Sequence, residues 1–330
     1  SATERMRVGL PDAGLHAVLE ARADWSNDWQ VAASLDVPPT TLADTGELRG
    51  MLRTLTGREL SVTGQVSAAA SLSLAANRPP RASLSAAVGN LDIGCPAEKW
   101  QVSGLSVGMA AEGPRAWRTP AGLGLTFASA RFGDFMLDGG SVRWQVRRDT
   151  LQVEQVDLNW CGGLLHAYGI SFDPRERLLE TVVYAERIEL GRLMTQMKIL
   201  QGTGAGRLYG RIPIQLDKGK LHLSESYLYS IPGESGMLKL SNAALIDQAL
   251  EQGNMAAAVR QRVRDALRNL RYSVFRMDLT GGGAQAALGV QIEGRSADHP
   301  ADPPVQVNIN VNGSLDDFVN FGIQMSDKLQ

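Results

Sequence analysis

The sequence predicts a mainly β protein in which short antiparallel strands follow one another at hairpin spacing. Many segments alternate apolar and polar residues with a period of two, as Val142, Trp144 and Val146 do. Breaks rich in Gly and Pro separate these segments, as is usual between the strands of antiparallel sheets. A parallel sheet would need a helix between successive strands, so the order of the elements favours antiparallel pairing.

The predicted strands occupy most of the chain from Ser61 onward. Their apolar residues recur mostly every second position, in keeping with side chains that point to opposite faces of a sheet. The clearest alternating segments are 72–74, 84–88, 102–107, 123–127, 142–146, 151–153, 275–279, 288–292 and 305–311.

Residues 206–233 predict a hairpin that carries no chemical motif. Its first strand alternates Ile212, Ile214 and Leu216, its second continues with Leu221 and Leu223, and Asp217-Lys218-Gly219-Lys220 is the turn between them. The five apolar side chains are therefore expected on one face. Pro213 has no N–H to donate, which predicts either an edge strand or a bulge at that position.

Helical spacing is limited to a few segments. A first helix follows Thr45, with Leu48, Met51, Leu52 and Leu55 on one stripe, and others are expected at about 187–200, 243–271 and 314–324. The helix at 243–271 carries basic residues on its outer face. Two interpretations of that face stay open: a solvated surface balanced by neighbouring acids, or contact with anionic lipid headgroups. The basic residues are Arg260, Arg262, Arg264 and Arg268.

Composition limits the class of protein. The chain has 330 residues, of which 44% are hydrophobic and 21% charged, which is typical of a folded protein rather than a disordered one. Its formal net charge of −2 gives no general electrostatic basis for binding nucleic acid. No apolar run reaches the roughly 18–20 residues that span a bilayer. Because Ser1 stands where an initiator Met would, we expect a trimmed chain.

The sequence offers no catalytic, metal or cofactor site, so we predict that the protein is not an enzyme. Its four histidines are far apart and none has a partner at metal-ligand spacing. The glycine-rich stretch at 202–210 precedes a strand and fits no phosphate-binding loop. Cys95 and Cys161 could form a disulfide or remain as two buried thiols, and both alternatives stay open.

Residues 204–233, "GAGRLYGRIPIQLDKGKLHLSESYLYSIPG", resemble the C-terminal signature of YdbH-like members of the AsmA-like superfamily. Two further matches follow in the expected order: "ALRNLRYSVFRMDL" at 266–279 and "VQVNINVNGSLDDFV" at 305–319. The resemblance is specific over about 200–325. The chain departs from the family pattern around 294–304, where "GRSADHPADPPV" replaces a tidier Asn-Pro turn.

The resemblance implies a bridge-like phospholipid carrier of the Gram-negative envelope. Its fold would be a long, strongly curved antiparallel sheet with a few amphipathic helices, and an apolar groove would hold lipid tails. We expect an N-terminal mixed segment (1–60), repetitive groove strands (61–200) and a C-terminal region continuous with the same sheet (201–330). The groove candidates are Val142, Trp144, Ile212, Ile214, Leu216, Leu221, Leu223 and Val307.

Two alternatives stay open. A closed sandwich could bury the apolar strand faces against each other, and the protein could be an envelope adaptor whose sheet edges bind partners without carrying lipid. For the lipid carrier, the resemblance implies a periplasmic location, with an inner-membrane anchor preceding Ser1 in the full-length protein.

The last predicted strand is a candidate partner site. It alternates Val305, Val307, Ile309 and Val311 with uncharged polar residues, and nothing charged within it would block pairing with another chain. Relatives are understood to receive strands from a small outer-membrane lipoprotein near this end. We therefore expect this strand to be an edge that such a lipoprotein extends by strand addition once the short helix from Ser314 moves away. The alternative that this helix docks permanently and seals the edge stays open.

Overall fold

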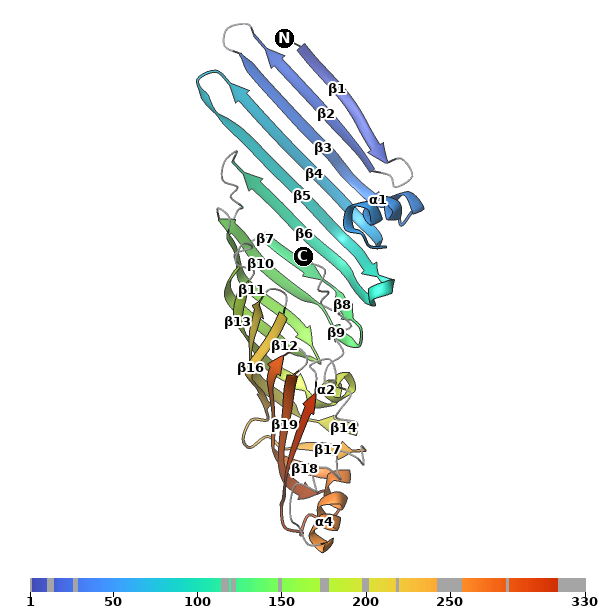
Figure 1. The fold of residues 1–330 in the computed structure, drawn as a ribbon, viewed down its shortest axis with the longest axis vertical. Coiled ribbons are helices and arrows are strands. Elements are labelled where there is room, and N and C mark those ends of the chain that lie inside the picture. The colour runs from blue at the N-terminus through green and yellow to red at the C-terminus, as the bar shows by residue number, and fades with distance from the viewer. Residues whose placement is uncertain are drawn as a thin grey trace. The chain divides into compact units, whose positions relative to one another are not determined.

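The computed structural model of the chain describes residues 2–10, 15–25, 29–113, 119, 123–147, 150–172, 178–197, 202–217, 220–241, 257–282 and 285–313. Strands make up 72% of the structure, and they belong to one antiparallel 20-stranded sheet that is not closed into a barrel (Figure 1). The predicted mainly β, antiparallel fold class is confirmed.

The chain forms two compact units. The first comprises residues 1–131, 139–156 and 169–174, and the second comprises 132–138, 157–168 and 175–330. Strands β8, β11 and β12 have residues in both units. The boundaries at residues 60 and 200 drawn from the sequence stay a prediction.

The first unit is a ladder of neighbouring strands that are adjacent in sequence. Each strand from β1 to β6 pairs with the next, β6 also pairs with β7, and β7 pairs with β10 (Figure 1). The bounds are β1 (Ala2–Leu10), β2 (Leu15–Asp24), β3 (Gln30–Leu42), α1 (Gly46–Thr56), β4 (Ser61–Ala75), β5 (Arg78–Cys95), β6 (Trp100–Glu112), β7 (Leu123–Phe127), β8 (Ser129–Phe132), β10 (Gly140–Arg147), β11 (Thr150–Trp160) and β12 (Gly163–Phe172).

Helix α1 covers one end of this ladder, because its apolar stripe faces the strands. Leu48 is buried in a core cluster, and Met51 and Leu52 pack against that cluster. Leu55 shares the stripe but is 73% exposed, since the cluster ends before the last turn of the helix. The buried members are Leu42, Leu48, Leu60, Val62, Leu91 and Cys95.

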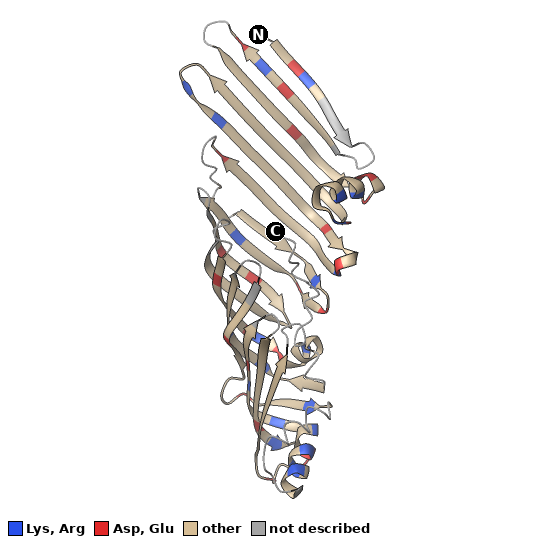
Figure 2. Ribbon diagram, in the orientation of Figure 1, with Lys and Arg blue, Asp and Glu red and all other residues tan. Residues whose placement is uncertain are grey.

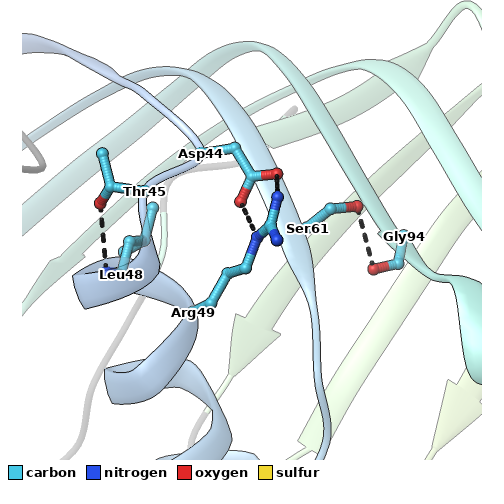
Figure 3. Close-up of polar contacts among 6 residues, drawn as sticks. All are labelled: Asp44, Thr45, Leu48, Arg49, Ser61 and Gly94. Carbon is cyan, nitrogen blue, oxygen red and sulfur yellow. Dashed lines mark hydrogen bonds and ion pairs between the residues drawn. The ribbon is translucent and has the colours of Figure 1, made fainter.

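Polar contacts fix where α1 begins (Figure 3). The Thr45 hydroxyl accepts a hydrogen bond from the Leu48 backbone N–H at 3.3 Å, and the Arg49 guanidinium donates to both carboxylate oxygens of Asp44 at 2.8 and 2.7 Å. The hydrogen bond from Arg49 lowers the pKa of the Asp44 carboxyl. This ion pair is therefore intact at neutral pH, and its contribution to stability is lost only as the pH falls through that lowered pKa.

We expect Thr45→Ala to destabilise the first unit by about 1 kcal/mol, because it removes the side-chain acceptor for one of the unpaired N–H groups that begin a helix. Urea unfolding followed by circular dichroism measures the change. Thr45→Ser keeps the hydroxyl and is expected to match the unsubstituted protein. Equal unfolding midpoints for all three would show that this cap does not contribute.

The second unit is more fully packed. Along β19, Leu288, Val290 and Ile292 are 1–3% exposed, and helices α2 and α4 bury residues such as Leu193 and Leu267. The bounds are β9 (Phe135–Leu137), β13 (Leu178–Glu189), α2 (Leu190–Gln196), β14 (Gly202–Ala205), β15 (Arg207–Asp217), β16 (Lys220–Tyr229), β17 (Gly236–Leu240), α4 (Ala257–Arg268), β18 (Leu270–Gly282), β19 (Gln285–Ser296) and β20 (Val305–Gly313).

Its strands are not all paired in chain order. β13 pairs with β15, and the ladder then runs through β16, β18 and β19 to β20. The short strands β14 and β17 pair with each other, and β17 also pairs with β18.

The hairpin expected at 206–233 is formed by β15 and β16. β15 is paired on both sides, so the edge-strand alternative for Pro213 is wrong, and the register shift between Arg211 and Ile214 shows the bulge instead. The bulge lies where proline has no N–H to give to the ladder. Residues 218 and 219 of the expected turn lie outside the described residues.

One helix prediction needs correction, and another falls on residues outside the described part of the structure. The helix expected to reach 271 ends at Arg268, because Leu270 and Arg271 already begin β18. Apolar residues at three- and four-residue spacing continue through Leu270, but that side chain is buried within a strand pair with Leu238. The segment 243–256 and the helix expected at 314–324 lie outside the described residues.

Candidate functional site

One face of the β1–β6 ladder is mostly apolar on all six strands, with Glu4 opposite Ala21 as a charged residue on β1. The register places Leu35 opposite Leu19 and Ala70, and Leu84 opposite Ala70 and Ala111. Side chains directly opposite in an antiparallel pair lie on the same face, so these contacts form continuous rows. The rows are Met6, Leu19, Leu35, Ala70, Leu84 and Ala111; Ala21, Ala33, Leu72 and Ala82; and Ala68, Ala86 and Met109.

The opposite face of the same strands is polar. The hydroxyls of Ser71 and Ser83 are hydrogen bonded across β4 and β5 at 2.7 Å, and Arg5 forms an ion pair with Glu20 across β1 and β2 at 3.3 Å. Figure 2 shows how few charged residues the strands β3 to β6 carry. The ladder thus has one polar face and one apolar face.

Much of the apolar face is not covered by any described residue. Five of its large side chains are 40–54% exposed, although α1 buries the other end of the same face. A shallow cavity of about 240 Å³ lies here, and its lining includes Leu19, Leu35, Leu72 and Leu84. We call this region the open apolar face. Its exposed members are Met6, Leu35, Leu72, Leu84 and Met109.

An apolar surface of this kind is uncommon on a soluble protein unless something binds it. The sequence matches the YdbH-like family, described as intermembrane phospholipid transport protein YdbH, over residues 5–319. The chain belongs to the YdbH-like family. No curated protein and no solved structure matches it.

Membership extends well beyond the resemblance at 200–325, because the match also covers β1 to β13. The family supports transport of phospholipid between membranes and places this YdbH-like chain in a cell envelope. It is a family of lipid transport and not of known enzymes. In the part of the chain that the structure describes, no helix is both long and apolar enough to cross a bilayer.

Two of the groove candidates from the sequence continue the apolar rows. Val142 on β10 lies opposite Leu125 on β7, and Leu125 lies opposite Val107 on β6. Because Val107 in turn lies opposite Val88 on β5, these residues form one row. Trp144 is half-buried and pairs with Leu123. The YdbH-like chain thus brings both residues to the same side of the first unit as the open apolar face.

Other candidates lie together in the second unit. Ile214 pairs with Leu223 in the register and with Thr181 on the other side, and Ile212 and Leu216 share its side of β15. These residues are half-buried except for Leu223, which is 7% exposed. Leu221 lies opposite Leu216, but its side chain lies outside the described part of the structure. Whether this second set touches lipid stays a prediction.

Val307 has closely packed surroundings. It lies opposite Ile292, which lies opposite Phe275, and the three side chains are 5%, 1% and 1% exposed. Contact with a lipid tail there would require this row to open. Val305 and Ile309 are also buried, whereas Val311 is half-buried. Among the described strands, β20 is paired with β19 alone.

The cysteines are both free and buried, so the alternative of two thiols holds. Burial raises the pKa of the Cys161 thiol to about 12, which keeps it protonated and unreactive at neutral pH. Within the described ranges, no group of three His, Cys, Asp or Glu side chains could hold a metal ion.

Sequence reasoning missed most of the open apolar face. The alternation at 72–74 and 84–88 is visible in the sequence, but Leu19 and Leu35 stand among alanines, serines and charged residues. Their shared row becomes evident only once the register of β2 to β5 is known. Testing every possible hairpin register for aligned Leu and Met residues could have found this face from the sequence.

Proposed function

We propose that the open apolar face binds the acyl chains of phospholipid during transport between membranes. The observation that carries this proposal is the set of Leu and Met side chains left 40–54% exposed on one face of the ladder. Each CH₂ group removed from water contributes roughly 0.8 kcal/mol. Partial cover of one acyl chain therefore supplies several kcal/mol without any polar contact.

The headgroup can stay in water in this arrangement. The face contains no buried charge that would have to pair with a phosphate: Arg5 and Glu20 lie on the other side, and Glu4, which lies opposite Ala21 on this side, is exposed. A surface that holds tails weakly and along its whole width also lets lipid move from one strand to the next. That property suits transfer better than tight capture does.

The competing function is an adaptor that carries no lipid. We expect phospholipid to co-purify with the protein and to be found by solvent extraction and mass spectrometry. A photo-crosslinking residue in place of Leu84 should label that lipid, whereas the same residue in place of Ser85 on the polar face should not. Protein free of lipid, or equal labelling from both positions, would favour the adaptor.

We also propose that β20 accepts a strand from a small outer-membrane lipoprotein. Support comes from its pairing with β19 alone among the described strands, and from the absence of charge between Val305 and Gly313. A strand with one unpaired edge exposes backbone donors and acceptors that another chain can extend. This attachment would serve either a lipid carrier or an adaptor.

A further inference from the structure

Helix α4 carries a basic face that its own acids do not balance. Arg260, Arg262 and Arg268 are exposed, and Arg264 is half-buried. Asp265 is the one acid in the helix, and it lies 3.7 Å from Arg268 while also accepting hydrogen bonds from Gln261. The solvated alternative assumed neighbouring acids that would neutralise this face, but Asp265 pairs with Arg268, and Arg260 and Arg262 remain exposed.

The strands beside α4 carry further basic residues, which alternate with buried residues such as Leu238 and Leu270 and so point to the other face of the sheet. Arg271 on β18 lies directly opposite Arg295 on β19, and both are exposed. Like charges in that position repel each other. Arg295 donates to the backbone carbonyl of Asp302, and exposed Lys239 lies on neighbouring β17. Figure 2 shows the blue residues gathered on α4 and these strands.

Among the described residues, nearby acids do not remove the excess of positive charge. Asp298 accepts a hydrogen bond from Asn269, and Glu234 and Asp302 lie in the adjoining turns. The basic side chains of this end outnumber them: Lys239, Arg260, Arg262, Arg264, Arg268, Arg271 and Arg295.

The apolar side of α4 is already occupied. Val263, Ala266 and Leu267 are 5%, 2% and 0% exposed against the second unit. The helix therefore cannot bury that side in a bilayer, and any membrane contact must be made by the charged face. Such contact is electrostatic, so salt should weaken it.

We propose that the basic face of α4 docks this end of the protein on the surface of a bilayer that contains anionic phospholipid. Charge complementarity selects the partner: exposed guanidinium groups such as those of Arg260 and Arg262 on a rigid helix match a surface of phosphates. The proposal does not depend on lipid carriage by the open apolar face, which lies in the other unit. It would bring the protein to a membrane from which lipid could be exchanged.

The test uses the whole chain and two kinds of vesicle: phosphatidylcholine alone, and phosphatidylcholine with about a third phosphatidylglycerol. We expect co-sedimentation with the anionic vesicles only, and loss of binding when salt is raised from about 0.05 M to about 0.5 M. The triple variant Arg260→Gln, Arg262→Gln, Arg268→Gln should weaken binding roughly 100-fold, at about fivefold for each arginine near the surface.

Matched variants separate local from general charge effects. Arg53→Gln, Arg78→Gln, Arg81→Gln changes the net charge equally at exposed sites of the first unit, and it should bind as the unsubstituted protein does. Lysine at 260, 262 and 268 keeps the charge and should retain binding. Gln is as good a helix former as Arg, and circular dichroism checks that α4 remains folded.

Three results would overturn the proposal. The first is equal binding to neutral and anionic vesicles. The second is an equal loss of binding in the two glutamine variants. The third is binding to a short DNA duplex, but not to vesicles, that the α4 variant abolishes, because the face would then recognise a different polyanion.

Discussion

Replacing Leu72 and Leu84 together by Asp is expected to remove at least about nine tenths of the phospholipid that co-purifies with the protein. The two side chains belong to diagonal positions of neighbouring strands, since each lies opposite an alanine of the other strand. Carboxylates there would sit against acyl chains, and desolvating an unpaired charge costs several kcal/mol. Quantitative mass spectrometry of solvent extracts measures the lipid per protein.

The fold should tolerate this change. Leu72 and Leu84 are 42% and 40% exposed without lipid, so the new carboxylates can remain in water when no tail is bound. Circular dichroism and the thermal midpoint should therefore stay close to those of the unsubstituted protein. A buried position such as Phe275 would not permit the same test, because its loss would disrupt the core.

The chain provides a matched control on the opposite face. Ser71 and Ser85 are sequence neighbours of Leu72 and Leu84 and occupy the same two strands, but their side chains point the other way. The pair Ser71→Asp, Ser85→Asp adds the same charge and should leave bound lipid unchanged. If both double variants lose lipid equally, or if neither does, the open apolar face is not where lipid binds.

The antiparallel architecture could be predicted from the sequence because strand periodicity is a local signal. Segments such as 142–146 and 288–292 alternate cleanly, and both are strands. The end of α4 could not be located in the same way. Leu270 satisfies helical spacing and strand pairing equally well, and its contact with Leu238 on β17 decides the outcome. Tertiary pairing overrides local pattern at such boundaries.

The candidate site was harder to predict than the fold. Alternation shows that a strand has an apolar side but not which strands share that side, because a slip of one residue exchanges the two faces. Val142 could be nominated from its own strand, whereas the row through Leu19, Leu35 and Leu84 depends on three successive registers. The abundant alanines between them give a weak hydrophobic signal.

Exposure separates the two sets of candidates. The open apolar face is apolar and no described residue covers it, as we expect of a surface that takes up and releases lipid. Ile292 and Val307 are as apolar in sequence, but they pack closely enough to be a core. Sequence pattern cannot distinguish these two situations, because burial depends on what lies over the strand and not on the strand itself.

Proline at position 308 is expected to lower capture of the proposed outer-membrane lipoprotein at the edge of β20 by at least about tenfold. Asn308 is exposed, and its neighbour Ile309 is 1% exposed. Ile309→Pro would therefore empty a core position as well as remove a backbone donor. Asn308→Pro removes an N–H and places a ring in the ladder without that loss of packing.

The control uses the other strand with a single described partner. β1 pairs with β2 alone among the described strands, and Thr3 is exposed on it as Asn308 is on β20. Thr3→Pro should leave capture unchanged, while Asn308→Pro should lower it at least about tenfold, the value of one or two lost hydrogen bonds. Pull-downs with the purified lipoprotein measure capture, and extracted phospholipid measures the apolar face in the same samples. Because β20 contributes nothing to the open apolar face, lipid content should be unaffected in both variants. Equal recovery of the lipoprotein with Asn308→Pro and with the unsubstituted protein would show that the partner joins elsewhere.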